Sequence, residues 1–416
     1  MTCTSKAAMS DDSICVVGMH FAPETTGNAP YTTALVGALA ESGVDVHAIT
    51  GVPHYPQWKV QPEYVRGLRW AEQGDGFRLT RLRHAVPRKP DLIGRLRMES
   101  SFFSLAYPEV RRDRSSAVIA VSPTLSGLAA ARIGARGRPV GVLVQDLNGN
   151  GARQAGLTGS RVSDTINRRE MDLLRRASLV GVITPRFAEI LVENGVDSSA
   201  IRLLPNFAHV EPVAASQAES RARLGWQQDG RYVVHTGNMG RKQGLETILE
   251  AARLHADNPR ITYVLVGDGN QRSNLQRSAE GLTNLRFMDP VDDGDYPHVL
   301  NAADVLVLCE RVGVKEMSLP SKLTSYSVAG RPIVASVERG SISAELLRKH
   351  DAAKIANAGS AESLACVIDE VLADPATMQS LVDGAGRLRS VVGGRAEAAE
   401  RYKAFGRELL DLPGGP

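Results

Sequence analysis

The sequence predicts an α/β protein built from two doubly wound units. Short apolar runs alternate with segments of helical apolar spacing along almost the whole chain, which is the pattern of parallel strands joined by helices. The alternation stops once, at a Pro-, Ala- and Ser-rich segment over 211–220, and then starts again. The length of 416 residues agrees with this, because a domain averages about 150 residues and two or three compact units are expected.

The composition is that of a globular protein and excludes several other classes. With 43% hydrophobic and 23% charged residues, the chain can bury sizeable cores, so wholesale disorder is excluded. The 49 basic and 46 acidic residues leave a net charge of +3, which is too small for a dedicated nucleic-acid binder. Four widely spaced cysteines form no C-x-x-C pair, which fits a reducing cytoplasm and predicts neither a zinc site nor a disulfide framework. No segment has the length and apolar character of a signal peptide or a membrane span.

The first unit is expected over residues 1–208. Its first strand is predicted at 14–19, because a short apolar run before a loop is typical of a parallel strand buried on both faces. A helix is predicted at 31–42, where apolar residues recur at helical spacing and Gly43 ends the pattern. The other strands expected in this unit are 44–50, 118–122, 140–145, 179–184 and 201–204.

A linker is expected at 209–220 and a second α/β unit at 221–394. The strands predicted in this unit are 232–236, 262–266, 285–288, 305–308 and 332–336. Residues 395–416 are expected to form a C-terminal helix and tail that cross back to the first unit. Open α/β folds bind ligands at the carboxyl ends of their strands, so the two sheets are expected to line a cleft.

Two glycine-rich loops between a strand and a helix are candidate phosphate sites. In the first unit, Gly27 and Asn28 precede a helix N-terminus, whose partial positive charge attracts anions; the alternative is a turn that merely needs glycine. In the second unit, Gly240, Arg241 and Lys242 lie in a similar loop, where the two cations can hold a diphosphate; the alternative is that one of them is only solvated. The later segment 267–272 reads G-x-G-x-x-R, lacks the third glycine of a dinucleotide site, and is interpreted as a turn.

A second helix start and an isolated aspartate are further candidates. Ser321 can cap a helix that Pro320 cannot extend backward, and Lys322 in its first turn would add positive charge for a leaving diphosphate; the alternative is an ordinary capped helix. Asp146 follows an apolar strand, where substrate-orienting side chains of α/β enzymes lie, but it can equally cap the next segment. The loop residues Glu24, His20 and His54 are weaker candidates, since lone polar loop residues are usually solvated.

A basic segment precedes a pair of phenylalanines in the first unit. The segment 81–97 holds one acid, Asp91, and six basic residues, and Phe102 and Phe103 follow it. This mixture predicts peripheral contact with an anionic membrane surface, while the alternative places the phenylalanines in the core. The basic residues are Arg81, Arg83, Arg88, Lys89, Arg95 and Arg97.

Several co-linear motifs resemble those of a known enzyme family. They occupy residues 21–32, 53–59, 144–146, 204–207, 237–246, 266–269, 319–324 and 330–335. In this order they are similar to the motifs of the family-four retaining glycosyltransferases, and within them to the colanic-acid-type subgroup. The resemblance covers nearly the whole chain and implies the GT-B fold, in which two Rossmann-like domains face each other across a cleft.

The resemblance also implies a reaction and its participants. A UDP- or GDP-sugar donor would be held mainly by the second unit and a hydroxyl acceptor by the first, with no metal ion and no other cofactor. The acceptor would be a polysaccharide precursor, a glycolipid or a small metabolite. The resemblance implies front-face attack, in which the leaving phosphate oxygen takes the acceptor proton, so catalysis depends on positioning and electrostatics.

The roles that follow for individual residues are expectations. The catalytic group would be Asp146, Lys242 and Lys322. Donor contacts are expected from Gly27, Asn28, Gly240, Arg241, Ser321 and Glu316. Acceptor contacts are expected from Glu24 and His54.

The sequence departs from the family pattern at two places. The family's Glu-x7-Glu pair, counted back from Gly330, falls on Met317 and Ser325, neither of which is acidic; Glu316 and Glu310 lie nearby. Where many relatives have histidine before the first-unit aspartate, this chain has Gln145. Two alternatives stay open for these reasons: a catalytically silent protein that binds nucleotide sugar or glycan as a partner subunit, and a nucleotide-sugar 2-epimerase on the same fold.

Overall fold

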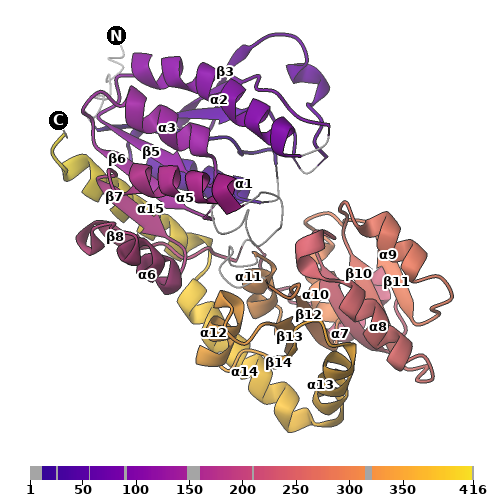
Figure 1. Ribbon diagram of the computed structural model, residues 1–416. Helices are drawn as coiled ribbons and strands as arrows, with labels where there is room; N and C mark the ends of the chain where they lie inside the picture. The colour runs from indigo at the N-terminus through magenta and orange to yellow at the C-terminus, as the bar shows by residue number, and fades with distance from the viewer. Residues whose placement is uncertain are drawn as a thin grey trace, which may run out of the picture. The chain divides into compact units, whose positions relative to one another are not determined.

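The chain forms two compact α/β units (Figure 1). The computed structural model describes residues 12–24, 27–55, 57–88, 91–147, 160–208, 210–313 and 321–414. The first unit comprises the described residues up to 205 together with those from 395 onward, and the second comprises those of 206–394.

The first unit contains an eight-stranded sheet in the order β3-β4-β2-β1-β5-β6-β7-β8. All neighbouring strands are parallel except β3, which runs antiparallel to β4 at one edge. The strands predicted for this unit are confirmed to within two residues, and β3 and β4 are additional. The bounds are β1 Ser13–Gly18, β2 Asp45–Gly51, β3 Arg69–Gln73, β4 Phe77–Leu82, β5 Ala117–Val121, β6 Val140–Val144, β7 Leu179–Val182 and β8 Ile201–Leu203.

The helices of the first unit come from both ends of the chain. Helix α15 packs beside α1, and its residues Phe405 and Leu409 lie against Gly141 of β6, where an added Cβ would stand 2.9 Å from Leu409. Helices α2 and α3 pack against each other (Figure 1). The bounds are α1 Ala29–Glu41, η1 Pro62–Tyr64, α2 Leu92–Arg112, α3 Leu125–Gly134, α5 Ser160–Leu174, α6 Pro185–Glu193, η2 Ser198–Ala200 and α15 Arg395–Asp411.

The second unit contains a six-stranded parallel sheet in the order β11-β10-β9-β12-β13-β14. The five predicted strands are confirmed and β14 is additional. The strands are β9 Arg231–Thr236, β10 Ile261–Val266, β11 Leu285–Met288, β12 Val305–Cys309, β13 Ile333–Val337 and β14 Lys354–Asn357. The helices are α7 Gln217–Leu224, η3 Arg241–Gln243, α8 Glu246–Leu254, α9 Arg272–Ser278, α10 Tyr296–Ala302, α11 Ser321–Val328, α12 Ile342–Lys349, α13 Ala361–Ala373 and α14 Pro375–Val392.

The linker expected at 209–220 overlaps a helix in the structure. Helix α7 begins at Gln217 because Ser216 and Glu219 cap it reciprocally: the Ser216 hydroxyl accepts the Glu219 N–H at 3.2 Å, and the Glu219 carboxylate accepts the Ser216 N–H at 2.7 Å. The Ser216-x-x-Glu219 spacing is a sequence signal for this helix start. The Pro-, Ala- and Ser-rich composition of the segment favoured a linker instead.

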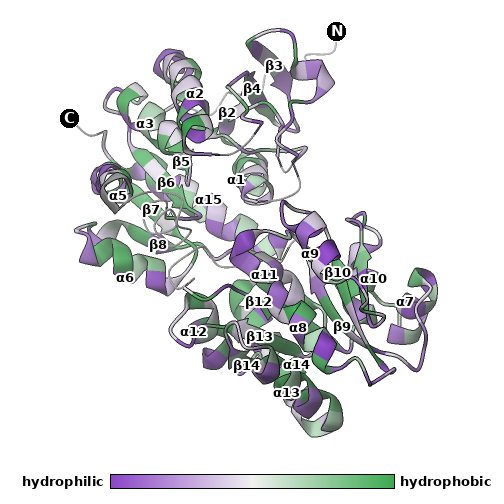
Figure 2. Ribbon diagram, turned by 45° about the vertical axis from the view of Figure 1, so that its right-hand side comes forward, coloured by the Kyte–Doolittle hydropathy of each residue, from purple (hydrophilic) through white to green (hydrophobic). Residues whose placement is uncertain are grey.

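Apolar strands form the centre of each unit (Figure 2). Val16, Ile119 and Val142 in the first sheet, and Val234 and Leu306 in the second, are at most 1% exposed. Parallel strands buried on both faces read as continuous apolar runs, which is why the sequence located them. In the part of the chain that the structure describes, no helix combines the length and apolar character needed to cross a bilayer.

The basic segment 81–97 does not form one continuous surface. Arg81 is buried in β4, where it pairs with Glu72 at 2.9 Å and donates to the Ala22 carbonyl at 2.7 Å, so it is removed from the predicted membrane contact. Phe102 is fully buried and belongs to the core. The N-terminal turns of α2 instead expose Ile93 and Leu96. Lys89 lies outside the described residues.

Candidate functional site

Asn28 and Asp146, which were predicted separately, are joined through Ser122 at the carboxyl edge of the first sheet. The Asn28 side-chain amide donates to the Ser122 carbonyl at 3.1 Å, and the Ser122 hydroxyl donates to the Asp146 carbonyl at 3.0 Å. The Asp146 carboxylate accepts the N–H of Leu147 at 2.8 Å. Because β5 and β6 are parallel neighbours, Ser122 and Asp146 follow strands that end at the same edge. Gly27, with a φ of 67°, begins this loop in the left-handed region.

Glu24 is the centre of a second polar cluster at the same edge. Its Oε1 accepts the backbone N–H groups of His54 and Tyr55, each at 2.8 Å, and its Oε2 accepts from Nδ1 of His20 at 2.7 Å. Burial alone would raise the pKa of Glu24, but the hydrogen bond from His20, the charge of His20 and the backbone hydrogen bond from His54 outweigh it and lower that pKa. Glu24 is therefore an ionised carboxylate that holds two loops together.

Two buried histidines stand next to Glu24. Nδ1 of His54 donates to the Val52 carbonyl at 3.0 Å, and Nδ1 of His84 donates to the Leu82 carbonyl at 3.2 Å, so each Nε2 is left as a lone-pair acceptor. Among the described residues neither Nε2 has a hydrogen-bond partner. Burial lowers the pKa of both rings, that of His84 to about 3, and both are neutral at pH 7. His84 was not predicted from the sequence.

The same cluster holds three residues of types that bind metal ions. His20, Glu24 and His54 have ligand atoms within 4.8 Å of one another. The Nδ1 atoms of both histidines are, however, already engaged as donors, His20 toward Glu24 and His54 toward the Val52 carbonyl. The geometry is that of a hydrogen-bonded network that orients polar groups at the sheet edge.

Two glycine loops pack against each other at the carboxyl edge of the second sheet. Gly237 follows β9 and Gly267 follows β10, and the Gly237 N–H donates to the Val266 carbonyl at 2.8 Å. A Cβ on Gly267 would lie 2.1 Å from the Gly237 carbonyl oxygen, and one on Gly269 would lie 2.6 Å from that of Met239. The G-x-G turn of the second loop is therefore required by packing against the first, in agreement with its interpretation as a turn.

Lys322 is placed beside the first of these loops. Its Nζ lies 3.1 Å from Nε2 of His235, and its Cε would be 3.7 Å from a Cβ on Gly237. Nδ1 of His235 donates to the Val307 carbonyl at 2.9 Å, so Nε2 carries the lone pair that accepts from the ammonium. Burial lowers the pKa of Lys322 to about 8, with the nearby Cys309 and Glu310 acting in the opposite direction.

Glu310 directly follows β12 and is 8% exposed. Its Oε1 accepts from the Ser343 hydroxyl at 2.8 Å, and its Oε2 has no hydrogen-bond partner among the described residues. Burial raises the pKa of Glu310 to about 7, although Ser343 and the charge of Lys322 act in the opposite direction. It is the acidic group that the structure places near Lys322, a position that the Glu-x7-Glu spacing did not predict.

The other residues predicted to bind the donor lie on helix η3, at the start of α11, or outside the described part of the chain. Arg241 and Lys242 are exposed on the one-turn helix η3. The Arg311 N–H donates to the Lys242 carbonyl at 2.8 Å, which connects η3 to the segment that follows Glu310. The Gly240 N–H donates to Oε1 of Gln243 at 3.2 Å, which fixes the start of η3. Ser321 is the first residue of α11, and its side chain is outside the described part. Glu316 also lies outside the described residues, as does Met317.

The comparisons with known proteins cover both units. Residues 26–206 match the family described as glycosyl transferase 4-like domain, and residues 216–387 match glycosyl transferases group 1. The putative colanic acid biosynthesis glycosyl transferase WcaI of Escherichia coli K12 is 29% identical over 342 residues, which cover 78% of this chain and 83% of the relative.

Solved structures show the same fold at lower identity. A sucrose-phosphate synthase from Thermosynechococcus elongatus is 19% identical with a TM-score of 0.75, and the match covers 96% of this chain and 99% of that one. The Anabaena protein HepE, solved in complex with UDP-glucose, is 16% identical with a TM-score of 0.67, over 96% of this chain and 100% of that one. The two family matches together cover most of the chain and show that it belongs to the family-four glycosyltransferases, and the solved structures show that it has the GT-B fold.

Proposed function

We propose that the protein is a retaining glycosyltransferase that moves a sugar from a UDP- or GDP-sugar to a hydroxyl of a polysaccharide precursor, glycolipid or small metabolite. The observation that carries the proposal is the pair of Lys322 and His235 at the carboxyl edge of the second sheet. Among the described residues, Lys322 has no carboxylate within 4 Å, and its neighbour His235 is neutral because burial keeps its pKa well below the ordinary value. A buried cation without a close counter-ion lowers the stability of the free protein, and an anionic ligand that binds next to it removes this cost.

The surroundings of Lys322 favour a diphosphate as that ligand. Lys322 lies in the first turn of α11, where backbone N–H groups are unpaired within the helix and the helix dipole favours negative charge. Gly237 gives the ligand an approach to backbone, since its φ of 106° favours glycine and no side chain covers the main chain there. Arg241 and Lys242, exposed on η3, are proposed to hold the outer phosphate oxygens.

The proposed reaction needs positioning and charge stabilisation from the chain. The bond between the sugar's anomeric carbon and the phosphate oxygen breaks while the acceptor oxygen attacks from the same face, and the acceptor proton passes to the departing phosphate oxygen. Lys322 and Lys242 stabilise the negative charge that develops on the diphosphate. Asp146, held by the connection through Ser122 to Asn28, is proposed to orient the sugar.

The first unit is proposed to bind the acceptor. The Nε2 atoms of His54 and His84 are buried acceptors without partners among the described residues, and a hydroxyl donor satisfies such an atom. Glu24 holds the loop of His54 in place through two backbone hydrogen bonds. The named function of the Escherichia coli relative, in colanic acid biosynthesis, and the UDP-glucose in the HepE structure support a glycan acceptor and a nucleotide-sugar donor.

The test is a thermal-shift panel of UDP, GDP, TDP, ADP and their common sugar conjugates. A ligand at 100 times its dissociation constant stabilises the native state by about 2.7 kcal/mol, which is readily measured. We expect one nucleotide diphosphate to stabilise the protein selectively, and slow release of that nucleotide from its sugar conjugate to be lost in Lys322→Ala and Lys242→Ala. Absence of a shift with every compound would overturn the proposal.

A silent nucleotide-sugar or glycan-binding subunit is the second candidate, favoured by one observation. Ser325, at a position where the family pattern has a carboxylate, is buried in α11 and introduces no charge there. This candidate predicts tight nucleotide binding without turnover across acceptors. A 2-epimerase is distinguished by its product, since it would interconvert nucleotide sugars without releasing nucleotide to an acceptor.

We also propose that the protein works at the cytoplasmic face of a membrane, with the start of α2 as its contact. Ile93 and Leu96 are 62% and 54% exposed, and Arg95 and Arg97 are exposed beside them. Apolar side chains flanked by cations suit an anionic lipid surface. Flotation with phosphatidylglycerol vesicles at low salt should retain the wild type and lose Leu96→Ser, whereas equal retention of both would contradict this contact.

A further inference from the structure

The first unit has a further polar feature, a hollow of about 600 Å³ that the proposed reaction does not use. It lies at the C-terminal ends of α2 and α3, and Tyr107, Pro108, Asp113 and Ala135 contribute to its wall. The five basic residues that line it are Arg111, Arg112, Arg114, Arg136 and Arg138.

The hollow lies at the edge of the sheet opposite the candidate site. Asp113 and Arg114 come shortly before β5, and Arg136 and Arg138 come shortly before β6, so they lie at the amino ends of these strands. Ser122 and Asp146 follow the carboxyl ends of the same strands. A strand of five residues at about 3.3 Å each separates the two edges by roughly 16 Å, so the hollow is a distinct feature.

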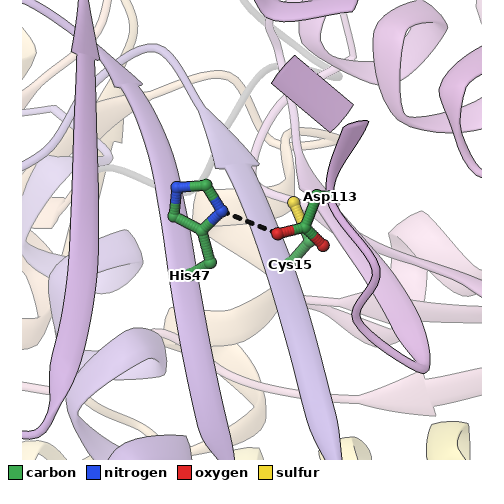
Figure 3. A group of neighbouring side chains, drawn as sticks. All are labelled: Cys15, His47 and Asp113. Atoms are coloured by element: carbon green, nitrogen blue, oxygen red, sulfur yellow. Dashed lines mark hydrogen bonds and ion pairs between the residues drawn. The ribbon is translucent and has the colours of Figure 1, made fainter. Parts of the chain in front are cut away.

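The one acid in the wall has its charge engaged inside the protein. Oδ2 of Asp113 accepts from Nδ1 of His47 at 2.7 Å, next to Cys15 (Figure 3). Oδ1 accepts the Ser115 N–H at 2.9 Å and lies 3.3 Å from the Arg138 guanidinium. Burial alone would raise the pKa of Asp113, but the hydrogen bonds from His47 and Ser115 hold it far below its ordinary value. The charge of Asp113 is therefore directed toward His47 and Arg138, and Arg111, Arg114 and Arg136 have no ion pair with it.

The arginines divide into structural and exposed members. Arg138 donates to four backbone carbonyls, among them Val110 at 2.8 Å and Ala135 at 2.7 Å, and so builds the wall. Arg112 faces Glu109 at 3.7 Å. Arg111, Arg114 and Arg136 are exposed, and none of the three has an ion pair among the described residues.

We propose that this hollow is a binding site for a small ligand carrying a diphosphate or two phosphate groups. Guanidinium groups match phosphate oxygens with paired hydrogen bonds, and three uncompensated arginines at one hollow suit a ligand with at least two negative charges. The volume is within the range of about 300–1,000 Å³ typical of small-molecule sites, which a duplex nucleic acid would exceed. The phosphate groups can belong to a soluble metabolite or to a lipid headgroup.

The test compares two variants of equal charge. Arg111→Gln with Arg136→Gln removes two exposed cations of the hollow, and Arg168→Gln with Arg169→Gln removes two exposed cations on α5 as the matched control. Inorganic pyrophosphate is titrated into each by calorimetry at low salt. We expect the hollow variant to bind at least about tenfold more weakly than the control, because it lacks two of the three lining arginines that have no ion pair among the described residues. Binding at the nucleotide site is common to both variants and cancels in the comparison.

A second arm separates the two sources of phosphate. Both variants are floated with vesicles of phosphatidylcholine containing phosphatidic acid. Loss of vesicle retention confined to the hollow variant assigns the site to a lipid headgroup, and weaker pyrophosphate binding without that loss assigns it to a soluble ligand. Equal behaviour of the two variants toward both probes would overturn the proposal. Arg114→Gln, a single exposed change, repeats the comparison should the double variant fold poorly.

Discussion

The ammonium nitrogen of Lys322 lies 3.1 Å from Nε2 of His235, and the opposite nitrogen of that ring is held by the Val307 carbonyl at 2.9 Å. The strand carbonyl thus selects the histidine tautomer that accepts a hydrogen bond from the lysine. A neutral acceptor directs the ammonium without cancelling its charge, which a carboxylate partner would do. The lysine is held in place and keeps its positive charge available for a ligand.

The activity is expected to fall on the alkaline side as Lys322 loses its proton. Its pKa in the free protein is lowered to about 8, so kcat/KM should decline through pH 8 with the loss of one proton. The decline should disappear in Lys322→Arg, whose charge persists at all accessible pH values. A rate that stays constant from pH 7 to pH 10 in the wild type would contradict a charged role for this lysine.

The stability contributed at Glu310 is expected to depend on pH with a definite sign. Its folded pKa is raised to about 7, so the folded state binds more protons than the unfolded state between about pH 4.5 and 7, and stability is lost as the pH rises through that window. Glu310→Gln should therefore stabilise the protein at pH 8, by about 1–3 kcal/mol, and have little effect at pH 4.5. Urea unfolding at both pH values measures this, and a variant that is less stable than the wild type at pH 8 would refute it.

Gly267→Ala should destabilise the second unit more than an alanine at another left-handed glycine. Gly267 has a φ of 136° and a Cβ there would meet the Gly237 carbonyl oxygen at 2.1 Å, whereas Gly281 has a φ of 86° with open space around it. Both variants carry backbone strain, so the difference between them isolates the collision and should be about 1–3 kcal/mol. Thermal unfolding of the two variants checks this. Equal melting temperatures would mean that the two loops move apart at little cost.

Asn28→Ala should lower kcat/KM by about 10- to 100-fold with a small effect on stability. The amide of Asn28 ties its loop to Ser122, whose hydroxyl in turn holds the segment of Asp146. Without the hydrogen bond from Asn28 to Ser122, we expect Asp146 to stay in its loop but to orient the sugar less well. The matched control is Asn274→Ala, an exposed change on α9. If both variants keep full activity, the tie has no part in the reaction.

The sequence predicted most of the parallel strands but missed β3, β4 and β14. Strand β3 carries alternating exposed and half-buried residues such as Arg69, Trp70 and Glu72, which gave no apolar run. Its neighbour β4 was hidden because Arg81, buried there, looks like a surface cation in the sequence. The pairing with Glu72 on β3 and the hydrogen bond to the Ala22 carbonyl explain its burial, and neither contact is encoded by local spacing.

The candidate site was predicted only in part, because some of its residues belong to local motifs and others depend on contacts between distant segments. Asn28, Asp146 and Lys322 belong to local motifs, a loop before a helix or a residue after a strand, and the sequence therefore identified them individually. The sequence gives no local sign of how His235 and Glu310 act, because their importance comes from burial near Lys322, which lies 87 residues after His235. The signal that was available is position: Glu310 directly follows a strand and His235 is near the end of one, at the edge where parallel sheets bind ligands.

Helix α15 completes the first unit only after the whole second unit has been synthesised. Its residues Phe405 and Leu409 cover Gly141, while residues 206–394 form the other unit in between. At roughly 5–20 residues per second, a ribosome needs some ten to forty seconds to bridge this interval. During that time the nascent first unit exposes an apolar surface under α15, while the second unit can already fold. The first unit therefore emerges from the ribosome first and reaches its complete fold last.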